Sequence, residues 1–154
     1  MSGRVGEPWE QREQSEHGDG PDYLDEEDVA YLLGEVAVVR DRALLRSALG
    51  RPRASAFGAD AYPGVWAKAV ALGESVMRNH PMTDRNKRTG FESMLLFLDY
   101  NGQPYADPDP DDAVAFVLRL AQGGYAGRFE EAVADFRRIL GASGPAGRAR
   151  VTRR

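Results

Sequence analysis

The stretch that most restricts the fold of this chain is FESMLLFLDY, residues 91–100. Its apolar residues recur at helical spacing and cover nearly every side of the helix that they predict: Phe91, Met94, Leu95, Leu96, Phe97 and Leu98. A helix that is apolar all round has to be enclosed by other elements. The Asn101-Gly102 pair that follows supplies the left-handed residue with which many helices end. The stretch therefore predicts a central, buried helix within an all-α helical bundle.

The rest of the chain supplies helices that would surround this one. Asp25, or Asp22 before it, can cap a helix whose first turn is acidic, and a helical pattern then lasts to the end of ALLRSALG. The apolar residues in its first part are Val29, Leu32, Leu33 and Val36. Further helices are predicted at about residues 65–78, from Asp111 or Asp112 to about residue 122, and at about residues 128–140. Together they predict one domain at residues 22–140, with a flexible extension at residues 1–21 and a flexible basic tail at residues 141–154.

One segment interrupts the helical pattern. RPRASAFGADAYPG, residues 51–64, contains two prolines and two glycines, which break helices and favour turns. It predicts a small β-hairpin or an extended flap, the only expected departure from the all-α fold class.

The composition restricts the class of protein. A chain of 154 residues, 42% of them hydrophobic and 29% charged, has the composition of one globular domain. It has no apolar run of the roughly 18 residues that a membrane span needs, and it does not start like a signal peptide, so we expect a cytoplasmic protein that does not bind membranes. The absence of cysteine excludes disulfides and thiolate metal sites. The net charge of -4 gives no indication of nucleic-acid binding.

The stretch HPMTDRNKRTGF, residues 80–91, places a strongly polar loop directly before the buried helix. The first backbone N–H groups of a helix have no partners within it, and the helix dipole favours negative charge there. Asn86, Lys87 and Arg88 lie at this start, which predicts a phosphate site. Asp84 can supply an oxygen ligand to a magnesium ion held by phosphates, and His80 is the side chain best suited to take a proton near neutral pH. These residues suit a reaction in which a hydroxyl group attacks a phosphate of a nucleotide. The alternative is a solvated turn without catalytic function.

The same stretch resembles the signature of the Fic/Doc family, H-x-F-x-(D/E)-G-N-x-R-x-x-R, and LLFLDYNG is similar to the helix end of Doc-type members. The resemblance implies a Fic/Doc helical bundle with a β-hairpin flap. It implies that His80 is the general base that deprotonates a target hydroxyl and that Asp84 binds Mg²⁺. It further implies that Asn86 orients phosphate in an anion hole and that Arg88 holds the more distant phosphates.

Two positions favour the Doc branch of that family. Lys87 matches Doc-type members, whereas AMP-transferring members often have glycine there, and Phe91 stands where the longer signature has its second arginine. The resemblance then implies transfer of the γ-phosphate of ATP to a protein hydroxyl, with transfer of AMP as the alternative. It also implies an antitoxin in trans, because the inhibitory pattern (S/T)-x-x-x-E-(G/N) of many relatives is missing from this sequence. The segment equivalent to the target-aligning flap is RASAFG: Arg53, Ala54, Ser55, Ala56, Phe57 and Gly58.

Two residues depart from the family signature. Met82 replaces a phenylalanine that anchors the loop, and methionine fills similar space. Arg85 replaces a glycine or alanine where backbone amides approach phosphate. If this backbone has a positive φ, the side chain costs about 1 to 3 kcal/mol of strain. If it does not, Arg85 can turn outward or add a cation beside the nucleotide. If Arg85 fills the anion site itself, the protein is a catalytically weakened interaction protein of the same fold.

Overall fold

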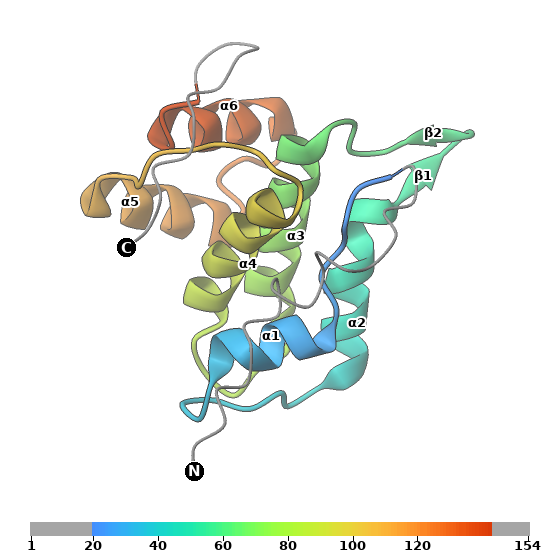
Figure 1. The fold of residues 1–154 in the computed structure, drawn as a ribbon, viewed down its shortest axis with the longest axis vertical. Coiled ribbons are helices and arrows are strands. Elements are labelled where there is room, and N and C mark those ends of the chain that lie inside the picture. Colours follow the sequence, from blue (N-terminus) through green and yellow to red (C-terminus); the bar gives the residue numbers. More distant parts are fainter. Residues whose placement is uncertain (1–19, 143–154) are drawn as a thin grey trace.

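The helix predicted from FESMLLFLDY is α4 (Asn86–Tyr100), and its residues from Ser93 to Leu98 are all buried. The computed structural model describes residues 20–142. In these residues α4 packs along α3 at the centre of a helical bundle, with α1 and α2 on one side of the pair and α5 and α6 on the other (Figure 1). The surrounding helices are α1 (Glu26–Leu33), α2 (Arg42–Gly50), α3 (Val65–Asn79), α5 (Pro110–Ala121) and α6 (Phe129–Ile139). The all-α fold class is confirmed, and α3, α5 and α6 begin and end close to the predicted positions.

Helices α3 and α4 approach each other closely because a glycine on each faces the other. A Cβ atom added to Gly90 would lie 3.0 Å from the Gly73 carbonyl oxygen and 2.7 Å from the Met77 Cγ atom. A Cβ atom added to Gly73 would overlap the buried Met94 side chain. The absence of side chains at these two positions therefore sets the distance between the two central helices.

The prediction for the first helical region was wrong in one respect. Asp25 caps α1 in a capping box with Asp28, as the acidic first turn indicated, but α1 ends at Leu33. Gly34 then takes a positive φ of 57°, and Val36, predicted to continue the apolar face, lies outside the helix with 66% of its surface exposed. The apolar spacing continued past the break by chance, because Gly34 ends the helix and residues 34–36 form a turn before the bridge residue Val39.

The predicted hairpin is present and projects from the bundle (Figure 1). Its strands are β1 (Ser55–Ala56) and β2 (Ala59–Asp60), joined through Phe57 and Gly58, which have positive φ values of 54° and 79°. The hairpin therefore lies inside the segment 51–64 from which it was predicted. Arg53, assigned to the flap, belongs to a short 3₁₀ turn instead, and its guanidinium lies 4.3 Å from the centre of the Tyr23 ring.

A buried lysine attaches this hairpin to the bundle. The Lys68 side chain on α3 is only 3% exposed, and its Nζ atom donates to the Asp60 carboxylate at 3.1 Å and to the Tyr62 carbonyl oxygen at 2.6 Å. A buried ammonium is stable only when it is paired and hydrogen-bonded, and these two contacts meet that need. Lys68 thus fixes the base of the hairpin, while its tip, Phe57, is fully exposed.

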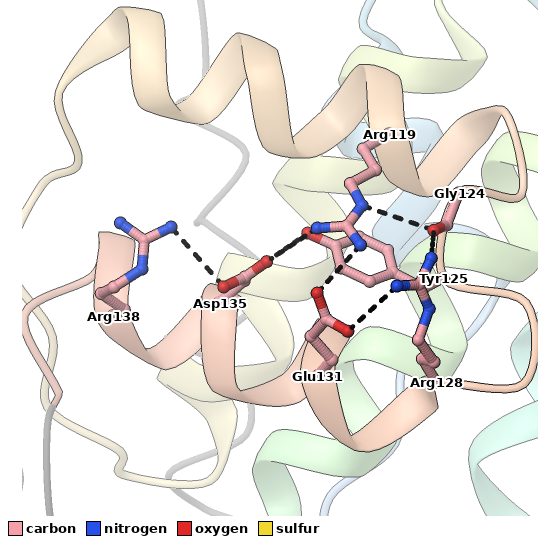
Figure 2. Close-up of polar contacts among 7 residues, drawn as sticks. All are labelled: Arg119, Gly124, Tyr125, Arg128, Glu131, Asp135 and Arg138. Carbon is pink, nitrogen blue, oxygen red and sulfur yellow. Dashed lines mark hydrogen bonds and ion pairs between the residues drawn. The ribbon is translucent and has the colours of Figure 1, made fainter.

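A polar network joins α5 to α6 (Figure 2). The Tyr125 hydroxyl donates to Asp135 on α6 at 2.7 Å, and the Arg119 guanidinium on α5 lies 3.9 Å from the centre of the Tyr125 ring. Arg119 also bonds Glu131 on α6 at 2.9 Å. Burial and the hydrogen bond to Asp135 raise the pKa of Tyr125 to about 12. The network therefore holds α5 against α6.

Substitution of Tyr125 by phenylalanine is expected to lower the free energy of unfolding by about 1 to 2 kcal/mol, because the hydrogen bond to a carboxylate is lost. The raised pKa sets the pH dependence: the contribution of the hydroxyl is fully present below the pKa of an unfolded tyrosine, about 10, and is lost as pH rises through about 12. Urea denaturation of both proteins at pH 7 and pH 11 measures this. A difference that widens at pH 11 would contradict the account.

The predicted extensions fall mainly on residues 1–19 and 143–154, which lie outside the described residues. Within residues 20–142, no helix is both long enough and apolar enough to span a bilayer.

Candidate functional site

The polar loop, residues 80–85, turns the chain sharply between α3 and α4. His80 ends α3 with a left-handed backbone at φ 50°, and Arg85 begins α4 with a second left-handed backbone at φ 63°. Left-handed residues reverse the chain in little space, and histidine is among the residues that tolerate this conformation better than most. The loop therefore places His80 and the start of α4 within one tight turn.

A segment that the sequence analysis missed holds the loop in place. We call residues 38–41, which precede α2, the clamp segment. Their backbone pairs with the loop in an antiparallel bridge between Val39 and Met82. The bonds are made from the Arg40 and Asp41 N–H groups to the Pro81 carbonyl oxygen, at 2.8 and 3.0 Å, and from the Thr83 N–H to the Val38 carbonyl oxygen, at 3.0 Å. The loop is thus fixed by residues about forty positions earlier in the chain.

The clamp segment also acts on the proposed base. The Arg40 guanidinium donates to the His80 carbonyl oxygen at 2.8 Å. The His80 side chain is left exposed, and no residue of the described chain bonds its imidazole. Arg40 is therefore a positioning residue for His80. The signal in the sequence was the valine-rich run after Gly34, VAVVR, which favours an extended conformation over a helix.

The Asn86 side chain holds the loop by bonding the backbone of Met82. Its side-chain Oδ1 accepts from the Met82 N–H at 3.0 Å, and its Nδ2 donates to the Met82 carbonyl oxygen at 3.2 Å. An asparagine amide carries two N–H groups, so one remains for a ligand. Met82 itself is only 2% exposed and anchors the loop in the core, the role assigned to the phenylalanine that it replaces.

The start of α4 has the features of an anion site. In the described chain no side chain caps this helix, so the N–H groups of Asn86, Lys87 and Arg88 have neither an intrahelical acceptor nor a side-chain cap. Lys87 is exposed, and Arg88 is exposed with its Nε atom 3.1 Å from the Glu92 carboxylate. Backbone donors, helix dipole and two cations thus lie in the first turn of one helix, the combination that binds phosphate.

Asp84 is suited to a metal ion that is shared with a phosphate. Its Oδ1 accepts from the Arg85 N–H at 2.7 Å, which orients the carboxylate, and the side chain is exposed. Residues 20–142 contain no group of three or more histidine, aspartate or glutamate side chains able to hold a metal ion by themselves. One oriented carboxylate fits Mg²⁺, which commonly takes one or two carboxylates together with substrate phosphates and water.

Arg85 occupies the strained position that the sequence analysis considered. Its φ of 63° shows that this backbone is left-handed, so a large side chain is present where glycine is favoured. Arg85 is the N-cap residue of α4 and is half-buried. The backbone strain predicted for a positive φ at Arg85 is therefore present.

Substitution of Arg85 by glycine is expected to raise the free energy of unfolding by about 0.5 to 1 kcal/mol, because glycine adopts a positive φ without steric strain. Chemical denaturation measures the change. Arg85→Ala is the matched control: it removes the guanidinium but keeps the Cβ atom. Equal stabilisation by both substitutions would show that the guanidinium, not the backbone, is the source of the effect.

The structure brings most of the predicted site residues together and leaves one group apart. His80, Asp84, Asn86, Lys87 and Arg88 belong to one turn and the helix start after it. The hairpin precedes α3, whereas the polar loop follows it, so the length of α3, about 22 Å for a helix of this size, lies between them (Figure 1). A target-aligning role for residues 53–58 stays a prediction.

Comparison with known proteins shows the family of the chain. The model of the Fic/DOC family matches residues 16–98. The Toxin Doc of Mycolicibacterium smegmatis (strain ATCC 700084 / mc(2)155) is 46% identical over 105 residues, which cover 65% of this chain and 81% of that protein. No solved structure matches the chain. The family match includes the clamp segment, the polar loop and nearly all of α4.

Proposed function

The chain belongs to the Doc branch of the Fic/Doc family, and we propose that it is a toxin that moves the γ-phosphate of ATP to a hydroxyl group of a target protein. The observation that best supports this proposal is the single turn in which an exposed histidine precedes an uncapped helix start with two cations. Phosphoryl transfer depends mainly on positioning and on stabilisation of charge, which such a turn can supply.

In the proposed reaction His80 takes the proton of the target hydroxyl. The hydroxyl oxygen forms a bond to the γ-phosphorus, and the bond between that phosphorus and the oxygen bridging to the β-phosphate breaks, so that ADP leaves with the bridging oxygen. The N–H groups of the first turn of α4 and the remaining Asn86 N–H hold the phosphate oxygens. Lys87 and Arg88 offset their negative charge.

Asp84 would hold Mg²⁺ in this site. When bound, the ion would offset the charge of the triphosphate and orient it. In this proposal Arg40 takes no direct part in the reaction, because its guanidinium bonds the backbone carbonyl oxygen of His80.

The proposed partners follow from the relative. The similar protein is named as a toxin, and we propose for this chain a separate antitoxin that restrains it and a cytoplasmic target protein with a serine, threonine or tyrosine hydroxyl. AMP transfer is the alternative reaction of the family. The strained Arg85 favours a further alternative, an interaction protein with weakened catalysis.

Radioactive label distinguishes these functions. The full chain is incubated with Mg²⁺, cell extract and ATP labelled at either the α- or the γ-phosphate, and protein-bound label is measured. Label from the γ position alone is expected. Label from the α position would show AMP transfer and overturn phosphate transfer. Absence of label from both positions, with extract from several growth conditions, would favour the weakened interaction protein.

A further inference from the structure

The β-hairpin has features that the packing of the bundle does not require. Every residue of β1 and β2 is exposed, and in the described part of the chain the two strands pair only with each other. Phe57 at the tip combines full exposure of an aromatic ring with a positive φ of 54°, and both are unfavourable. Unpaired strand edges readily accept a segment of another chain. The hairpin thus has the properties of a pairing site for a segment of a protein partner.

Lys68 lies where a positive charge is doubly unfavourable. It is the fourth residue of α3, so its ammonium lies near the positive end of the helix dipole, and it is buried. The face of α3 around it is apolar, with Ala69, Val70 and Leu72 all buried. A methionine would therefore suit the packing of α3 better than a lysine. The contacts that compensate the buried ammonium are those with the hairpin, to the Asp60 carboxylate and the Tyr62 carbonyl oxygen.

The chain segment that enters the hairpin is bonded to the same helix. The Arg51 Nη1 group donates to the Ser75 hydroxyl at 3.3 Å, and its Nη2 atom lies 3.8 Å from the Glu74 carboxylate. The Nε group of Arg51 donates to the Tyr62 hydroxyl at 2.6 Å. Because the Tyr62 carbonyl oxygen also accepts from Lys68, Tyr62 connects the two ends of the hairpin. Both ends are thus held by polar bonds to α3.

Helix α3 carries both this attachment and the proposed base. Lys68 lies in its first turn, and His80 ends it twelve positions later. At the rise of an α-helix, the two residues are about 18 Å apart along one axis. The helix itself is held by close packing against α4. The position of the hairpin relative to His80 therefore depends on whether the hairpin can turn about its attachment to α3.

We propose that Lys68 is a positioning residue for the target protein: through Asp60 and Tyr62 it holds the hairpin in one orientation on α3, so that a target segment paired with the hairpin directs its hydroxyl to His80. The proposal rests on the proposed function, since it concerns the acceptor of that reaction. Without Lys68 the hairpin has to be ordered each time a target binds, which weakens target binding. A target that is bound still meets an unchanged His80 and phosphate site.

Kinetics of the Lys68→Met variant test this separation of binding from chemistry. The full chain is incubated with Mg²⁺, γ-labelled ATP and increasing concentrations of cell extract as the source of target. The extract concentration that gives half the maximal labelling rate is expected to rise about tenfold, while the maximal rate stays unchanged. The affinity for Mg²⁺ and the β,γ-imido analogue of ATP, measured by calorimetry, should also stay unchanged. A fall in the maximal rate or in nucleotide affinity would show that Lys68 only stabilises the fold and would overturn the proposal.

Distances between spin labels test the orientation of the hairpin without any activity. The chain contains no cysteine, so labels can be attached specifically at Phe57→Cys, at the tip, and at Arg78→Cys, an exposed position in the last turn of α3. Double electron–electron resonance is expected to give a narrow distance distribution when Lys68 is present and a broad one in the Lys68→Met background. Equal distributions in both backgrounds would overturn the proposal.

The matched control is Arg46→Met, which removes the same charge at an exposed position of α2 that bonds Glu26 and not the hairpin. It is expected to leave the labelling kinetics and the distance distribution unchanged. An equal rise in the half-maximal extract concentration for both variants would show that net charge is the cause and would overturn the proposal. Absence of His80-dependent label with the wild type would overturn the proposed function and the target role of Lys68 together, whereas the distances decide separately whether Lys68 fixes the hairpin.

Discussion

Substitution of His80 by asparagine or alanine is expected to lower the rate of phosphate transfer to the target by about 10² to 10⁴-fold, the usual contribution of a positioned general base. The exposed imidazole has no hydrogen-bonding or ionic partner among residues 20–142, so its loss removes no polar interaction of the side chain. Transfer of γ-labelled phosphate at saturating ATP measures the rate.

The asparagine and alanine substitutions are compared because they differ in how well they tolerate the left-handed backbone of residue 80. His80 has a positive φ of 50°, a conformation that asparagine tolerates and alanine does not. The asparagine variant is therefore expected to lose activity with little change in stability, whereas the alanine variant should lose both. If the asparagine variant transfers phosphate at the wild-type rate, His80 is not the base, and another group in the loop has to be sought.

Substitution of Gly90 by alanine is expected to lower the free energy of unfolding by about 2 to 3 kcal/mol, although alanine favours helices more than glycine does. The added Cβ atom would lie 2.7 Å from Met77 Cγ and 3.0 Å from the Gly73 carbonyl oxygen, so α3 and α4 must move apart. Because α4 begins at the anion site, nucleotide binding should weaken as well. Urea denaturation measures the stability.

Gly50→Ala is the matched control for this prediction. Gly50 also lies in a helix, at the end of α2, but nothing lies within 4 Å of an added Cβ atom there. That substitution is expected to be neutral or slightly stabilising, since only helix propensity changes. A similar loss of stability in both variants would show that the close approach of α3 and α4 is not the cause.

The central part of the fold could be predicted from the sequence. The apolar residues from Phe91 to Leu98 specify a buried helix by their spacing alone, and Gly102 ends it with the expected positive φ. The hairpin was predicted from the prolines and glycines of residues 51–64, and its strands and turn lie inside that segment. These are local signals, which depend on residues close together in the chain.

The failures depend on contacts between distant residues. The helical spacing that included Val36 was misleading, because Gly34 interrupts the helix and the next residues bind the polar loop instead. No local pattern shows that Arg40 bonds His80 or that the Asn86 amide bonds Met82. The sequence identified which residues form the candidate site, but not which residues hold them in position.

The clamp segment links the candidate site to the folding of the whole domain. Arg40 and His80 are separated by forty residues, and closing a loop of that length is entropically unfavourable unless the elements between them are already packed. Those elements are α2 and α3, which contact each other directly. If α2 separates from α3, the bonds to Pro81 and His80 are lost in the same event. A partly unfolded molecule of this kind would therefore lose the arrangement of His80 and the start of α4 on which the proposed transfer depends.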